Sequence, residues 1–120
     1  MLTDRVENGY GLSKDVVDKI HALGTKLIIT VDNVISAVEE AEYIKELGME
    51  MVITDHHLEG EALPDCVAIV DPHRKDHDCA FKEYAGVGVA LKLCCALEGN
   101  DERVFEDFAD IAAIGTVADL

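Results

Sequence analysis

The sequence predicts an α/β domain with a parallel, Rossmann-like sheet, and three observations lead to this prediction. Two short apolar runs, at residues 27–31 and 52–54, are rich in β-branched side chains and end abruptly in polar residues, as buried strands do. The stretch between them, residues 34–48, has the periodicity of one helix. Strand, helix and strand make a βαβ unit, whose crossover leaves the two strands parallel.

Start and stop signals delimit the helices of the first half. Ser13 is a suitable N-cap for a helix that runs through Leu23 and that Gly24 ends. Ser36 and Glu39 have capping-box spacing at the start of the crossover helix, and Gly48 is placed to stop it. The predicted apolar faces are Val16, Val17, Ile20 and Leu23 in the first helix, and Val38, Ala41, Ile44 and Leu47 in the second.

The second half of the chain predicts one more strand and two more helices. Residues 67–70 form a third short strand, stopped by Asp71-Pro72, and a long polar loop follows. Residues 85–97 form a helix that is apolar almost all round, so we expect it to be buried. Residues 104–114 form the last helix, which ends at Gly115.

Composition limits the function classes. A chain of 120 residues that is 49% hydrophobic can form the core of one domain at most. The net charge of −15 opposes non-specific binding to nucleic acid, because phosphate neutralisation needs a positive surface. A cleft that holds cations would reverse this sign only locally, so we expect any DNA track to lie outside this segment.

Cysteine usage and the lack of targeting signals favour a cytoplasmic location. The four cysteines form no C-x-x-C pair, which suits reduced thiols. The sequence contains no signal peptide and no apolar run long enough to cross a membrane.

The strongest functional signal is the polar ending of the two strands. Asp32 follows the first strand, and Asp55, His56 and His57 follow the second. Parallel strands share one end, so these side chains should meet at the carboxyl edge of the sheet, where α/β proteins bind ligands. Asp32 alone could be a helix cap, but three ionisable residues in a row after an apolar strand favour a divalent-metal site.

Five ordered segments resemble the DHH phosphoesterases, and in particular their RecJ-type single-stranded-DNA exonucleases. Asp55-His56-His57 is similar to the signature triplet of that family. The other matching segments are residues 5–13, leading into the second motif; 30–33, the motif itself; 85–90, after the third; and 115–119, the fourth. Their order and spacing match over nearly the whole chain.

The resemblance implies a role for each matching residue. Asp32 would bridge two metal ions, Mn²⁺ or Mg²⁺, and His56 and Asp119 would bind one of them. His57 would face the scissile phosphate, with Asp55 orienting the neighbouring imidazole. The implied activity of the intact protein is 5′-to-3′ hydrolysis of single-stranded DNA in repair and recombination.

The chain departs from the family pattern in three respects. The first motif, His-x-Asp-x-Asp-Gly, is expected upstream of residue 1, and a C-terminal substrate-binding domain is expected downstream. We therefore expect residues 1–120 to be a partial DHH domain, with weak metal binding and negligible catalysis on its own. Val34 stands where the second motif usually has Gly, and a position that needs positive φ would suit Val poorly.

Other signals remain open. Gly86 and Gly88 before a helix could cradle a phosphate, or could allow close packing of that helix. Arg74 could contact substrate phosphates, although a solvated charge is the simpler interpretation. Two alternative functions stand beside the exonuclease: a DHH enzyme acting on nano-RNA, cyclic dinucleotides or polyphosphate, and a degenerate DHH-like module without catalysis.

Overall fold

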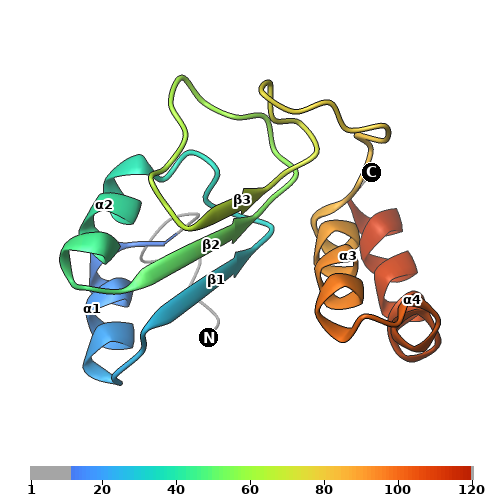
Figure 1. The fold of residues 1–120 in the computed structure, drawn as a ribbon, viewed down its shortest axis with the longest axis horizontal. Coiled ribbons are helices and arrows are strands. Elements are labelled where there is room, and N and C mark those ends of the chain that lie inside the picture. Colours follow the sequence, from blue (N-terminus) through green and yellow to red (C-terminus); the bar gives the residue numbers. More distant parts are fainter. Residues whose placement is uncertain (1–11, 120) are drawn as a thin grey trace.

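The computed structural model describes residues 12–119, and in them three parallel strands form one sheet in the order β1-β2-β3 (Figure 1). The strands are β1 (Leu27–Val31), β2 (Glu50–Thr54) and β3 (Ala68–Val70). The predicted α/β class with a parallel sheet is therefore confirmed.

Residues 12–119 also contain four helices: α1 (Lys14–Ala22), α2 (Val38–Glu46), α3 (Gly86–Glu98) and α4 (Asp101–Ala118). Figure 1 shows α1 and α2 together on one side of the sheet. It also shows α3 and α4 as a helical hairpin beyond the tips of the strand arrows. The hairpin therefore lies near the carboxyl edge of the sheet, where the candidate metal ligands emerge.

The core lies between the sheet and α1 and α2. Ile28 and Met51 are paired across β1 and β2, and Ile53 on the same strand is fully buried. These side chains cluster with residues of both helices, and the buried cluster comprises Val17, Ile28, Val34, Ala41, Ile44, Met49, Met51 and Ile53. Alternation along the strands places Leu27, Ile29 and Val31 on the opposite face of β1, where each is about half exposed.

Two predicted helix boundaries are wrong. Helix α2 begins at Val38 with Ala37 at the N-cap, so Ser36 and Glu39 do not form the expected capping box. Helix α4 begins at Asp101, where the side chain of Asn100 accepts a hydrogen bond from the Arg103 amide at 3.2 Å. It continues through Gly115, which lies inside the helix and packs against Val87 of α3. A Cβ on Gly115 would lie 2.8 Å from Val87 Cγ1, so the glycine allows this close packing.

Two predicted burial patterns also need correction. Leu23 follows the end of α1 and is 81% exposed, so the core face of that helix is carried by Val16 and Val17. Helix α3 is not buried all round, since Leu97 near its end is 75% exposed. Among residues 12–119, no helix has the length and apolar character needed to cross a bilayer.

The burial of β2 predicts a large difference between two isoleucines. Ile53→Ala removes a fully buried side chain and should lower the free energy of unfolding by about 2–5 kcal/mol. Ile114→Ala in α4 alters a side chain that is 72% exposed and should change it by less than about 0.5 kcal/mol. Urea unfolding followed by circular dichroism measures both values, and equal losses would contradict this core assignment.

Candidate metal centre

The register of the sheet aligns three aspartates at the carboxyl edge. Val31 pairs with Thr54, and Thr54 pairs with Val70, so the next residues along the three strands are Asp32, Asp55 and Asp71. Backbone pairing continues one step further, because the Asp32 amide donates to the Thr54 carbonyl at 2.9 Å. The Asp55 amide likewise donates to the Val70 carbonyl at 3.0 Å.

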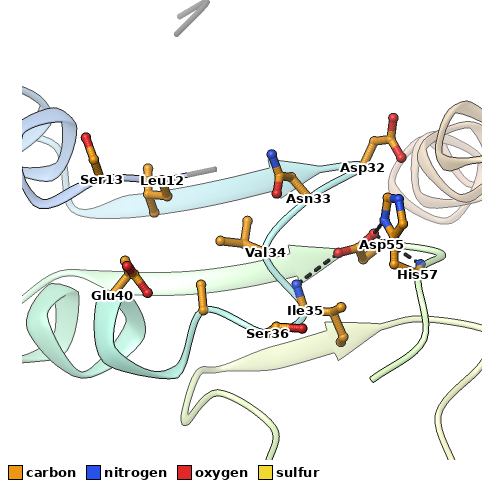
Figure 2. A pocket seen from close by; sticks show the side chains of 11 residues that line it. Leu12, Ser13, Asp32, Asn33, Val34, Ile35, Ser36, Glu40, Asp55 and His57 are labelled. Carbon is orange, nitrogen blue, oxygen red and sulfur yellow. Dashed lines mark hydrogen bonds and ion pairs between the residues drawn. The ribbon is translucent and has the colours of Figure 1, made fainter. Parts of the chain in front are cut away.

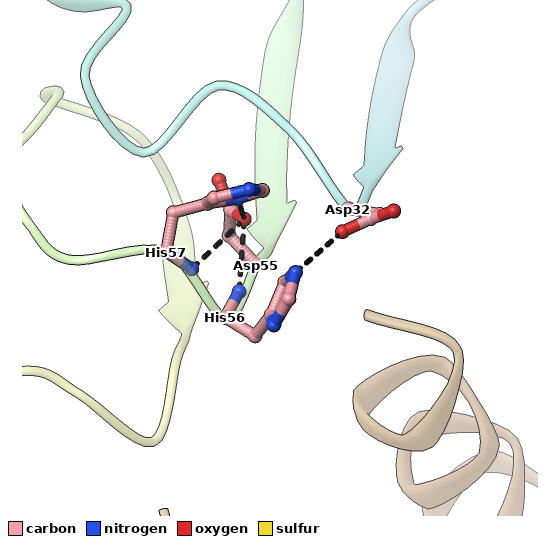
Figure 3. Close-up of side chains that lie close together, drawn as sticks. All are labelled: Asp32, Asp55, His56 and His57. Carbon is pink, nitrogen blue, oxygen red and sulfur yellow. Dashed lines mark hydrogen bonds and ion pairs between the residues drawn. The ribbon is translucent and has the colours of Figure 1, made fainter. Parts of the chain in front are cut away.

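Asp55 is fully buried and acts as an acceptor for four donors. Its Oδ2 accepts from the Ile35 amide at 2.9 Å, which ties the loop after β1 to the end of β2 (Figure 2). Its Oδ1 accepts from the amides of His56 at 2.8 Å and His57 at 3.3 Å, and lies 2.7 Å from His57 Nδ1 (Figure 3). A buried carboxylate needs such partners, since an unpaired one would be strongly destabilising.

These contacts shift the titration of both partners. Burial alone would raise the pKa of Asp55, but the hydrogen bonds from the His57 ring and from the three amides outweigh it and hold the pKa below its usual 3.8. The hydrogen bond to Asp55 raises the pKa of His57 above 6.5, against the opposing effect of partial burial. The negative charges of Asp55, Asp32 and Asp119 add to this rise.

His56 is largely buried between two acidic side chains that come from distant segments. Its Nε2 lies 2.9 Å from Asp32 Oδ1, and its Nδ1 lies 3.6 Å from Asp119 Oδ2 at the end of α4. The contact with Asp32 lacks hydrogen-bond geometry, so the buried Nε2 has no hydrogen-bond partner among the described residues. Such an orphaned nitrogen beside a carboxylate suits a coordinated cation.

Four side chains together could hold a metal ion. One donor atom from each of Asp32, Asp55, His56 and His57 lies within 4.8 Å of the others. Carboxylate oxygens and imidazole nitrogens are ligands that Mn²⁺ accepts. The chemistry of the donor set and the orphaned His56 nitrogen therefore both fit a divalent cation (Figure 3).

The loop between β1 and α2 contains two non-glycine residues with positive φ. Asp32 has φ of 62° and Val34 has φ of 83°. A β-branched residue is strained in this region, and a Cβ there costs about 1–2 kcal/mol. Position 34, where the family pattern usually has glycine, thus does have a positive φ, and the buried side chain of Val34 occupies it.

A cavity of about 590 Å³ opens beside the acidic and histidine cluster (Figure 2). Asp32, Asp55 and His57 line one part of it, and the rest is lined by the loop after β1, the start of α2 and the two residues before α1, Leu12 and Ser13. The cavity gives a ligand access to His57, whose side chain is 61% exposed.

The remaining candidates from the sequence lie in different surroundings. Gly86 lies against the carboxylate of Asp32, and Gly88 lies against the ring of Tyr84. Arg74 lines a separate cavity, and its guanidinium binds Asp76 and the Ile69 carbonyl. The motif at residues 5–13 falls outside the described residues, except for its last two positions.

Two features of the centre escaped the sequence analysis. Asp71 is buried at the end of β3, where its Oδ1 accepts from the His73 amide at 2.7 Å and its Oδ2 has no partner among the described residues. Burial raises the pKa of Asp71. Its position directly after a strand, as for Asp32 and Asp55, was a usable signal. The hydrogen bond from Ile35 to Asp55 had none, because it joins residues 20 positions apart.

The Asp55–His57 pair predicts a pH window for stability. The contribution of Asp55 is complete above pH 3.8 and is lost as the pH falls through its lowered pKa. The contribution of His57 is complete below pH 6.5 and is lost as the pH rises through its raised pKa. The pair should therefore stabilise the fold most between about pH 4 and 6.5.

An NMR titration checks the cause of this shift. The His57 ring protons should report a pKa above 6.5, and Asp55→Asn should bring it back toward 6.5. The exposed ring of His21 on α1 is a control signal in the same spectra, and its chemical shift at one fixed pH should be the same in both proteins. An unchanged His57 titration in Asp55→Asn would contradict the assignment.

Because φ is positive at residue 34, the glycine variant of Val34 should be more stable than the alanine variant, the reverse of the usual order. Val34→Ala and Val34→Gly remove nearly the same buried side chain, but glycine relieves the backbone strain, so Val34→Gly should be the more stable by about 1 kcal/mol. At Val17 inside α1 the usual order should hold, with the glycine variant about 1 kcal/mol less stable than the alanine variant. The same order at both positions in urea unfolding would count against the strain.

Comparisons with known proteins agree with this fold. The family model described as "DHH family, N-terminal domain" matches residues 2–116. The single-stranded-DNA-specific exonuclease RecJ of Bacillus subtilis (strain 168) is 49% identical over 119 residues. That alignment covers 99% of this chain and 15% of the relative. The protein of the same name from Escherichia coli (strain K12) is 42% identical over 132 residues, covering 100% of this chain and 23% of the relative.

A solved structure, that of exonuclease RecJ bound to manganese, matches with a TM-score of 0.82 and 35% identity. The match covers 100% of this chain and 30% of that one, so the chain spans less than a third of the length of each protein compared here. The family model covers most of the chain, and the relatives and the solved structure carry one name. The chain therefore belongs to the DHH family, and its resemblance to the RecJ-type members is confirmed.

Proposed function

We propose that this chain supplies part of a metal-dependent phosphodiesterase centre of the RecJ type, which degrades single-stranded DNA from the 5′ end. One observation carries the proposal. The largely buried ring of His56 lies between Asp32 and Asp119, which come from distant segments of the chain, and its Nε2 has no hydrogen-bond partner among the described residues. Such a convergence has a clear use if the three side chains share a cation.

Asp32, His56 and Asp119 are the proposed metal ligands. The metal-bound solved relative favours Mn²⁺, with Mg²⁺ as the alternative. The resemblance to the family implies that the complete site would hold two ions. When bound, divalent cations would stabilise charge on the phosphate and make the attacking water more acidic. We propose that residues 1–120 form part of a DHH domain, and that further ligands and a substrate-binding domain come from other segments.

His57 would donate a proton to the substrate, and Asp55 would orient the His57 ring for this. Asp55 holds His57 Nδ1, so Nε2 of the same ring is left for the substrate. The hydrogen bond to Asp55 raises the pKa of His57, which increases the protonated fraction of the ring at a given pH. The ring can then donate from Nε2 to a phosphate oxygen or to the departing oxygen.

The relatives support the substrate class, and the charge of the chain indicates where the strand would be held. Both relatives are named as single-stranded-DNA-specific exonucleases. The net charge of −15 makes this segment a poor track for a polyanion, so the cations would attract the scissile phosphate and other parts would hold the strand. A cytoplasmic site of action in DNA repair and recombination, without a membrane partner, is part of this proposal.

Mn²⁺ calorimetry tests the ligand assignment. The chain should bind Mn²⁺ saturably, and Asp32→Ala and His56→Ala should each abolish binding, because each removes one donor of a small ligand set. His21→Ala, a change to an exposed histidine on α1, should leave the affinity unchanged. Equal binding by all four proteins would mean that the metal lies elsewhere.

A segment exchange tests the activity. This chain would replace the matched segment of the Bacillus subtilis RecJ, which is 49% identical to it. The chimera should digest 5′-labelled single strands with Mn²⁺, and Asp32→Ala or His56→Ala should remove that activity while His21→Ala retains it. A chimera that hydrolyses only short RNAs or cyclic dinucleotides would favour the other DHH activities instead.

A further inference from the structure

Gly86, the first residue of α3, lies directly against the side chain of Asp32. A Cβ placed on Gly86 would lie 2.2 Å from Asp32 Oδ1, 2.3 Å from Cγ and 2.5 Å from Cβ. Real Cβ atoms essentially never come within 3.0 Å of another heavy atom. All three of the closest atoms belong to one residue, so any side chain at position 86 conflicts first with the proposed metal ligand.

Rotation of the Asp32 side chain would not relieve this conflict. The Asp32 Cβ is itself 2.5 Å from the added atom, and its position is set by the main chain. That main chain is held by the hydrogen bond from the Asp32 amide to the Thr54 carbonyl at 2.9 Å. The residue also has φ of 62°, a region in which L-residues have little freedom.

Helix α3 is no freer to move away. Gly86 and Val89 are both buried in its first turn. Val87 contacts Gly115 of α4, where a Cβ would lie 2.8 Å from Val87 Cγ1. The Asp32 side chain, by contrast, is about half exposed. A side chain at position 86 would therefore force the Asp32 main chain to shift, and the Asp32 carboxylate would move with it, away from His56 Nε2, which it now approaches to 2.9 Å.

We propose that Gly86 is a positioning residue: the absence of a side chain there sets the Asp32 carboxylate beside His56 and so fixes two of the metal ligands relative to each other. The inference rests on the proposed function for the statement that Asp32 is a ligand. The close approach of Gly86 in α3 to Asp32 after β1, which leaves no space for a side chain at position 86, is independent of that function. It gives Gly86 a function distinct from cradling a substrate phosphate.

A mutant cycle tests the clearance without metal. Gly86→Ala should lower the melting temperature of the chain by about 5 °C or more, because Asp32 or α3 must shift. In an Asp32→Gly background the same change should cost less than about 2 °C, because the conflicting atoms are gone and glycine accepts the positive φ. Folding of Gly86→Ala only in that background would also support the proposal. Equal losses in both backgrounds, or failure to fold in both, would overturn it.

Mn²⁺ calorimetry then tests the positioning. Gly86→Ala should weaken Mn²⁺ binding by about 10-fold or more, as loss of a residue that orients a ligand does. Gly60→Ala is the control, since a Cβ there meets nothing closer than 3.7 Å, and its affinity should stay within about 2-fold of the parent chain. Unchanged affinity in Gly86→Ala would overturn the positioning role. A parent chain without Mn²⁺ affinity would count instead against the ligand set of the proposed function, and the mutant cycle would still decide the clearance.

Discussion

The carboxylate of Asp55 is the interaction on which the rest of the centre depends. It is fully buried, and four donors saturate it: three backbone amides and one imidazole. A buried anion would otherwise be strongly destabilising, so the donors and the carboxylate hold one another in place. Through Ile35 it fixes the loop after β1, and through the amides of His56 and His57 it fixes the turn after β2. These hydrogen bonds connect the ends of β1 and β2 at one edge of the sheet.

At this edge of the sheet the buried and the accessible side chains have different positions. Asp55 stays inside and orients His57, while the exposed ring of His57 faces the cavity. His56 turns the other way, toward Asp32 and Asp119. The α3–α4 hairpin completes the arrangement from beyond the strand ends, since its first residue, Gly86, lies against Asp32, and Asp119 at the end of α4 lies against His56. The chain thus brings the proposed ligands together, although the proposed activity needs further parts.

The sequence was informative where a period or a strand end carried the signal. The βαβ unit, the parallel sheet and the meeting of Asp32 with His56 at the carboxyl edge all followed from the apolar runs and their polar endings. The start of α2 and the length of α4 did not, because packing against other elements outweighed local capping signals and the stop expected at Gly115. The hydrogen bond from Ile35 to Asp55 and the positive φ of Val34 depend on contacts between distant segments, which leave no period in the sequence.

The central claim is that the strand ends and the helical hairpin together form one metal centre around His56. Anomalous diffraction at the manganese absorption edge, from crystals of the chain grown with Mn²⁺, tests it most directly. The account predicts a peak in contact with His56 and with the carboxylates of Asp32 and Asp119. A manganese peak that contacts none of these three side chains, or crystals with no manganese peak at all, would contradict it.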